Sequence, residues 1–75
     1  MDSDARVQGR VVDENGEPLP GVNVIIKGSS LGAQTGFDGE FGIDAPKNAT
    51  LIFSYVGYVS QEFQLGDKTE VFIDL

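Results

Sequence analysis

Glycine and proline divide this chain into short segments. The longest stretch without either residue, Lys47 to Val56, has only ten residues, and it is rich in β-branched and aromatic side chains. An α-helix of average length needs about 11–12 residues, so a helix of ordinary length has nowhere to form. The spacing therefore predicts a chain made of strands and turns.

Alternating apolar and polar residues between the turns locate the expected strands. In the second of these, the apolar side chains Val22, Val24 and Ile26 share one face. The expected strands are residues 6–13, 22–27, 33–35, 40–44, 50–56, 58–65 and 69–75. Six or seven short strands of this kind predict an all-β fold, an immunoglobulin- or transthyretin-like sandwich of two sheets. The order of the strands stays open between a meander and a Greek key.

The segment Thr50 to Val56 is the most apolar of the expected strands. Leu51 and Phe53 share one face with Tyr55, while Ile52 and Val56 occupy the other. A strand that is apolar on both faces is typically covered on both faces. We therefore expect it to lie in the centre of a sheet.

Two dipeptides, Asn15-Gly16 and Asp38-Gly39, are strong turn signals, because their residues tolerate positive φ. Pro18 and Pro20 follow the first of them. Each proline fixes φ and removes a backbone donor, so residues 17–21 are not expected inside a sheet ladder.

Length and charge limit the classes of function. Seventy-five residues make one small domain, and the net charge of −7 argues against binding nucleic acid or an anionic membrane surface. No apolar run approaches the roughly 18 residues that span a bilayer, so no direct membrane insertion is expected. Residues 1–5 are interpreted as an acidic leader or as non-native residues, and residues 6–75 as a domain excised from a longer protein.

The residue types argue against catalysis. The chain has no histidine and no cysteine, so its serines lack the usual base and no thiol nucleophile exists. Two carboxylate pairs, Glu14 with Glu17 and Asp38 with Glu40, are interpreted as solvated surface groups. The cluster around Asp13 does not have the spacing of a calcium loop, and Asp13 is expected to cap its own turn. We predict no enzyme, no metal and no cofactor.

Four apolar side chains are candidates for contact with a partner. Ile25, Ile52 and Phe72 occupy the outward phase of their strands, and Phe37 lies at a loop tip. Neighbouring exposed apolar groups often mark a partner surface. The terminal strands 6–13 and 69–75 are further candidates, because each could offer a free sheet edge. Aromatic residues such as Phe37 leave a glycan contact as an alternative.

Three motifs follow one another along the chain: a first turn, a Thr-x-x-Asp-Gly hairpin and a Ser-Tyr-Val-Gly-Tyr strand end. Their residues are Gly16, Pro18, Leu19, Pro20, Gly21, Asp38, Gly39, Tyr55, Gly57 and Tyr58. In this order the motifs resemble the carboxypeptidase-D-regulatory-like domain found at the N-terminus of SusC/RagA-type TonB-dependent outer-membrane transporters, and the resemblance implies a structural role for these residues. One departure is Gly36, where the family usually has Asp after Thr35, and this change is expected to loosen the hairpin loop.

The resemblance implies a non-catalytic domain on the periplasmic side of the outer membrane, in a transporter for glycans or other nutrients. Its implied partners are other domains of the parent protein and a periplasmic or outer-membrane protein. Two alternatives remain: a structural spacer in a peptidase or adhesin, and a glycan-binding module.

Overall fold

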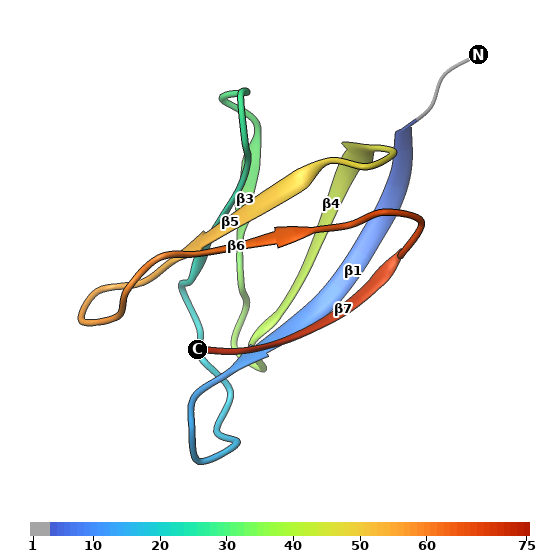
Figure 1. The fold of residues 1–75 in the computed structure, drawn as a ribbon. Coiled ribbons are helices and arrows are strands. Elements are labelled where there is room, and N and C mark those ends of the chain that lie inside the picture. Colours follow the sequence, from blue (N-terminus) through green and yellow to red (C-terminus); the bar gives the residue numbers. More distant parts are fainter. Residues whose placement is uncertain (1–3) are drawn as a thin grey trace.

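The computed structural model describes residues 4–75, which form seven strands in two sheets and contain no helix (Figure 1). The strands are β1 (Asp4–Val12), β2 (Asn23–Ile26), β3 (Gly32–Gln34), β4 (Glu40–Pro46), β5 (Thr50–Ser54), β6 (Gln61–Gln64) and β7 (Glu70–Asp74). The prediction of an all-β sandwich is confirmed. Residues 1–3 of the expected leader lie outside the described residues, among which no helix is long and apolar enough to cross a membrane.

The two sheets have the strand orders β4-β1-β7 and β3-β2-β5-β6. Strand β1 is central in the first sheet: it pairs antiparallel with β4, where Val7 faces Ile43, and parallel with β7, where Val11 faces Ile73. This order excludes a simple meander, because a meander contains no parallel pair of strands. It also corrects one expectation: within the described part of the chain, β1 is paired on both sides, so β7 alone of the two terminal strands has a free edge.

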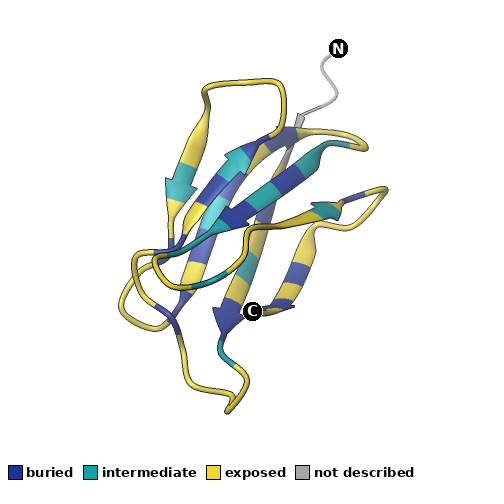
Figure 2. Ribbon diagram, turned by 60° about the vertical axis from the view of Figure 1, so that its left-hand side comes forward, coloured by how far each residue is buried: buried dark blue, intermediate teal, exposed yellow. Residues whose placement is uncertain are grey.

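The inward faces of both sheets enclose one apolar core (Figure 2). Phe53 of β5 is completely buried, and its ring meets the ring of Phe41 of β4 edge-on, with centroids 5.6 Å apart. Val24 and Val71 are also buried, as the alternation of their strands predicts. The two sheets therefore meet through the side chains that share the predicted inward phase.

The strand expected over residues 50–56 ends at Ser54, and the one expected over 58–65 is reduced to Gln61–Gln64. Between them the amide of Tyr58 donates to the carbonyl of Tyr55 (3.0 Å), and Gly57 adopts φ +87°, which closes a turn. Val56 therefore leaves the sheet and is 90% exposed, so the expectation that it is covered on the outer face of β5 was wrong.

The connections between strands gather at two ends of the sandwich. The motif end consists of residues 13–22, 35–39 and 55–60 together with Leu75, whose amide donates to the carbonyl of Val12 (2.8 Å). The opposite end carries the start of β1 and residues 27–31, 47–49 and 65–69. All three resemblance motifs, although far apart in the sequence, thus lie at one end.

Candidate interaction surfaces

The first turn of the motif end is closed by Asp13. Its Oδ1 accepts hydrogen bonds from the amides of Asn15 (2.8 Å) and Glu17 (2.9 Å), and its carbonyl accepts one from Gly16. The expected capping role of Asp13 is confirmed. Pro18 forms only an isolated bridge with Val12, so the Pro18 to Gly21 segment lies outside the named strands.

Thr35 joins this first turn to the second hairpin. Its buried hydroxyl donates to the carbonyl of Leu19 and accepts the amide of Val22 (2.9 Å). The backbones also pair, since the amide of Gly21 donates to the carbonyl of Thr35 and the amide of Thr35 donates to the carbonyl of Val22. This one hydroxyl therefore bonds to both sides of the Pro20-Gly21 turn: it donates to the Leu19 carbonyl before the turn and accepts from the Val22 amide after it.

Gly39 and Gly21 bring the three motifs into close contact. A Cβ on Gly39 would lie 2.6 Å from the carbonyl oxygen of Val11 and 3.1 Å from the Leu19 nitrogen. A Cβ on Gly21 would lie 3.9 Å from the ring of Tyr55, which in turn packs against Tyr58 with ring centroids 5.8 Å apart. The residues that carry the resemblance therefore form one packed structure rather than three independent turns.

The loop that carries the departure at Gly36 is closed by its backbone. The Gly36 amide donates to the carbonyl of Glu40 (2.8 Å), and the Gly39 amide donates to the carbonyl of Gly36 (2.9 Å). These two bonds need no side chain at position 36. The turn can therefore form with glycine there.

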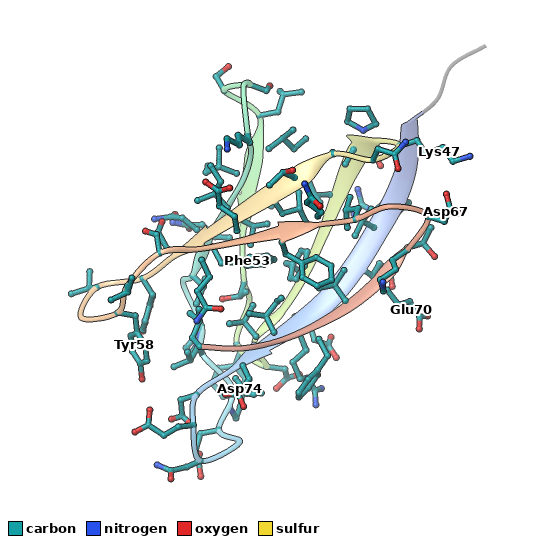
Figure 3. All side chains as sticks on the ribbon, viewed as in Figure 1. Lys47, Phe53, Tyr58, Asp67, Glu70 and Asp74 are labelled. Carbon is teal, nitrogen blue, oxygen red and sulfur yellow. The ribbon has the colours of Figure 1, made fainter. Side chains whose placement is uncertain are left out.

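Charge is distributed unevenly between the two ends. The motif end and the adjoining end of β7 contain five carboxylates and no lysine or arginine. These acids are Asp13, Glu14, Glu17, Asp38 and Asp74. Three lysines lie toward the opposite end, where Lys47 approaches Asp67 (3.8 Å), and Figure 3 shows this pair far from Tyr58 and Asp74. The motif end is therefore an acidic surface.

Three large apolar side chains project from this acidic end. Phe37 and Val56 are each 90% exposed, and Val59 is 86% exposed. Phe37 was a predicted contact residue, and it does not fold back onto the sandwich. The two valines were not predicted as contact residues, because each was placed inside an expected strand, Val56 in residues 50–56 and Val59 in residues 58–65. The strand breaker Gly57 between them was the available signal.

Ile25 and Ile52 are brought together, as their shared phase suggests. They face each other across β2 and β5, on the outer side of the four-stranded sheet. The Cδ1 atom of Ile25 lies over Gly32, where a side chain would collide with it. Both isoleucines are only partly exposed.

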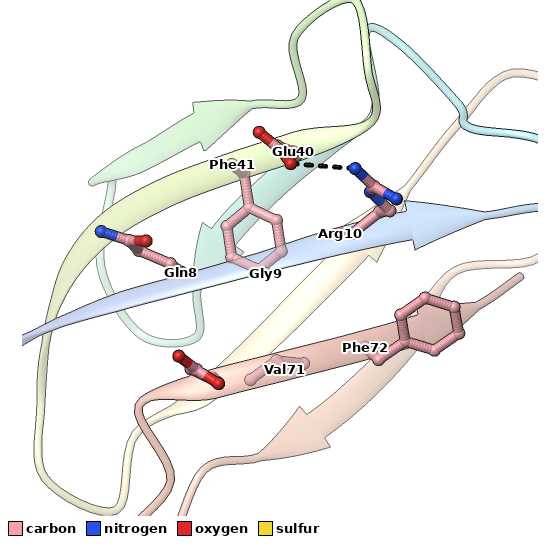
Figure 4. Close-up of a pocket in the computed structure, with 8 residues that line it drawn as sticks. Gln8, Gly9, Arg10, Glu40, Phe41, Val71 and Phe72 are labelled. Atoms are coloured by element: carbon pink, nitrogen blue, oxygen red, sulfur yellow. Dashed lines mark hydrogen bonds and ion pairs between the residues drawn. The ribbon is translucent and has the colours of Figure 1, made fainter.

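Phe72 lies elsewhere, on the outer side of β7, and is 67% exposed. It stands beside a hollow of about 590 Å³ over β4, β1 and β7, which has Gly9 near its centre (Figure 4). Arg10 faces Phe72 in register, but its guanidinium group bonds to Glu40 of β4 (2.9 Å). The four predicted contact residues therefore form no single patch.

The described residues contain no group of three His, Cys, Asp or Glu side chains placed to hold a metal ion. The carboxylates of Glu14, Glu17, Asp38 and Glu40 are all exposed. Aromatic ring pairs within the described part are confined to the core pair and Tyr55 with Tyr58.

Tyr58 reports on the electrostatics of the motif end. Burial and the nearby carboxylates of Asp13 and Glu14 raise the pKa of Tyr58 above 10.0, because each disfavours the phenolate. The folded chain then holds a proton that the unfolded chain releases, so stability falls as pH rises from 10.0 through the folded pKa.

To test this, phenolate absorbance is titrated in a Tyr55→Phe variant, in which Tyr58 is the remaining tyrosine. We expect a midpoint above 10.0, and a lower one after the further change Glu14→Gln. The control Asp67→Asn, at the opposite end, should leave it unchanged. A midpoint of 10.0 or below would show that Tyr58 does not lie in an acidic, partly dehydrated setting.

Comparison with known proteins agrees with this arrangement of turns and strands. Residues 7–75 match the CarboxypepD_reg-like domain family. The chain is 44% identical over 71 residues to TonB-dependent receptor P3 and 42% identical over 71 residues to TonB-dependent receptor P26, both of Formosa agariphila. It is 37% identical over 67 residues to TonB-dependent receptor SusC of Bacteroides thetaiotaomicron. These alignments cover 92%, 95% and 89% of the chain but only 7% of each receptor.

The fold defines the class of protein: a small all-β domain with no enclosed site among its described residues. The chain belongs to the CarboxypepD_reg-like domain family, and the relatives that it matches are TonB-dependent receptors, SusC among them. The suspected resemblance is confirmed. The chain spans only a small part of the length of these receptors.

Proposed function

We propose that this chain is a non-catalytic accessory domain, at the periplasmic N-terminus of a SusC-like TonB-dependent transporter in the outer membrane. It acts by contact within a system that takes up glycans or other nutrients. The observation that carries this proposal is the motif end, where Phe37, Val56 and Val59 are exposed on an acidic surface. Apolar groups so exposed often mark surfaces that a partner covers.

Leu75 also lies at the motif end, where its amide donates to the carbonyl of Val12 directly beside the first turn. The proposed partners are the neighbouring domain of the receptor and a further periplasmic or outer-membrane protein.

The proposal is tested by deleting residues 6–75 from the full-length receptor. We expect substrate uptake to fall while the amount of receptor in the outer membrane, measured by surface labelling, stays the same. Unchanged uptake and unchanged surface levels would contradict an accessory role. A second receptor, in which an unrelated β-sandwich of similar length replaces residues 6–75, separates contact from spacing: restored uptake would favour the structural spacer.

A further inference from the structure

Strand β7 is a free edge whose charges are not balanced within the sheet. Among residues 4–75 it pairs on one side only, with β1. Its outward side chains are Glu70, Phe72 and Asp74, which gives the order acidic, aromatic, acidic. In register, Glu70 faces the neutral Gln8 and Asp74 faces Val12, so neither carboxylate has a basic neighbour across the pair.

At the other edge of the same sheet, both carboxylates of β4 are paired with arginines. Strand β1 carries two arginines, and both bond to β4: Arg6 to Asp44 (3.4 Å) and Arg10 to Glu40 (2.9 Å). None of the ion pairs within the described residues reaches β7. The other cations are engaged elsewhere, because Lys27 bonds to Glu62, Lys47 approaches Asp67, and Lys68 lies over the ring of Phe63.

The backbone of β7 is also available. The carbonyl of Thr69 accepts from the Gln8 amide, and the amide of Leu75 donates to the Val12 carbonyl, so these alternate residues point toward β1. Because the direction of backbone groups alternates along a strand, those of Glu70, Phe72 and Asp74 point toward the open edge. Figure 3 shows Glu70 and Asp74 along this edge; Figure 4 shows Phe72 on the same strand, and its side chain is 67% exposed.

We propose that the β7 edge binds an extended cationic segment of a separate polypeptide, which adds as a further strand to the sheet. Charge complementarity fixes the chemistry of this segment: Lys or Arg opposite Glu70 and Asp74, with an apolar residue between them opposite Phe72. Opposite charges and apolar pairs directly across two strands stabilise pairing, and main-chain hydrogen bonds supply the rest. The proposal rests on the proposed function, because it names the chemistry of one partner of that interaction domain.

The probe is a peptide with blocked ends and the sequence Thr-Lys-Thr-Val-Thr-Lys-Thr, titrated into the ¹⁵N-labelled chain. We expect saturable amide shifts concentrated at residues 70–74. A peptide with Glu in place of both Lys should bind about 2- to 30-fold more weakly or not at all, from two charge pairs across the strands. Shifts that do not saturate, or that map to the loops of the motif end, would overturn the proposal.

The double variant Glu70→Lys with Asp74→Lys should reverse the preference, so that the Glu peptide binds more tightly than the Lys peptide. Its matched control is Glu17→Lys with Asp38→Lys, which changes the net charge equally at the motif end and should retain the preference for Lys. Equal loss in both variants would show only general attraction to an acidic protein, and would overturn the proposal.

A second variant tests the proposal even if the charge-reversed double variant does not fold. Phe72→Thr keeps a residue suited to strands. It should weaken binding of the Lys peptide, which should still bind more tightly than the Glu peptide. If Phe72→Thr binds the Lys peptide with unchanged affinity, Phe72 makes no apolar contact with the peptide, which contradicts the proposed register. If no peptide binds at all, the carboxylates only keep the edge from pairing, as edge charges often do. That result would leave the receptor deletion experiment unaffected, so the two proposals fail separately.

Discussion

Replacing Thr35 with valine is expected to lower the free energy of unfolding by about 2–6 kcal/mol, since each of the two buried groups left without a partner costs about 1–3 kcal/mol. The shape of the side chain is nearly unchanged, but the Leu19 carbonyl loses its donor and the Val22 amide loses its acceptor. For a chain of this length the total stability is roughly 4–11 kcal/mol. The loss expected from removing this single hydroxyl is therefore a large fraction of the free energy of unfolding.

Equilibrium unfolding in urea measures this loss, and Thr35→Ser is the matched control. Serine keeps the hydroxyl and removes one methyl group, so its cost should be about 1 kcal/mol. If the valine variant is as stable as the serine variant, the hydroxyl does not join the first turn to the second hairpin. The account of the motif end would then need another connection.

Gly39→Ala is expected to destabilise the chain by about 2–5 kcal/mol, from a left-handed backbone of about 1–2 kcal/mol and an overpacked contact of about 1–3 kcal/mol. Gly39 has φ +76°, and a Cβ there would press on backbone atoms of Val11 and Leu19. Both neighbours are held by the bonds from the Val11 amide to the Gly39 carbonyl and from the Leu19 amide to the Val11 carbonyl. Neither can move aside without breaking a bond.

Gly16→Ala separates the two contributions to this loss. Gly16 has a similar φ of +81°, but nothing lies within 4 Å of the position that its Cβ would take. Thermal unfolding of this control should show the backbone cost alone, about 1–2 kcal/mol. Equal losses at Gly39 and Gly16 would mean that the close approach between the first turn and the hairpin is absent.

The regular parts of the fold could be predicted from alternation. The inward phases of β2 and β5 follow from Val24 and Phe53, which are both buried. Alternation reports only which face a residue occupies, so it could not show that β7 returns to lie parallel with β1. That pairing depends on contacts between the two ends of the chain, and it decides which strand has a free edge.

The motif end could be predicted only in part. The resemblance identified Gly21, Gly39 and Tyr55, and turn chemistry identified Asp13. Neither could show that these residues meet, because convergence depends on the buried hydroxyl of Thr35 bonding on both sides of the first turn. Nor could alternation reveal the exposure of Val56, since the strand stops where the Tyr55–Tyr58 turn closes rather than where apolar residues end.

The contact proposed at the motif end is tested most directly by changing its exposed valines in the full-length receptor. In the variant Val56→Ser with Val59→Ser, neither side chain is buried, so the fold and the surface level of the receptor should be unchanged. The account predicts that uptake falls. The matched control, Leu31→Ser, alters a side chain that is 63% exposed at the opposite end and should leave uptake unchanged. Normal uptake by the valine variant, or an equal fall in the Leu31 control, would contradict a contact made by the motif end.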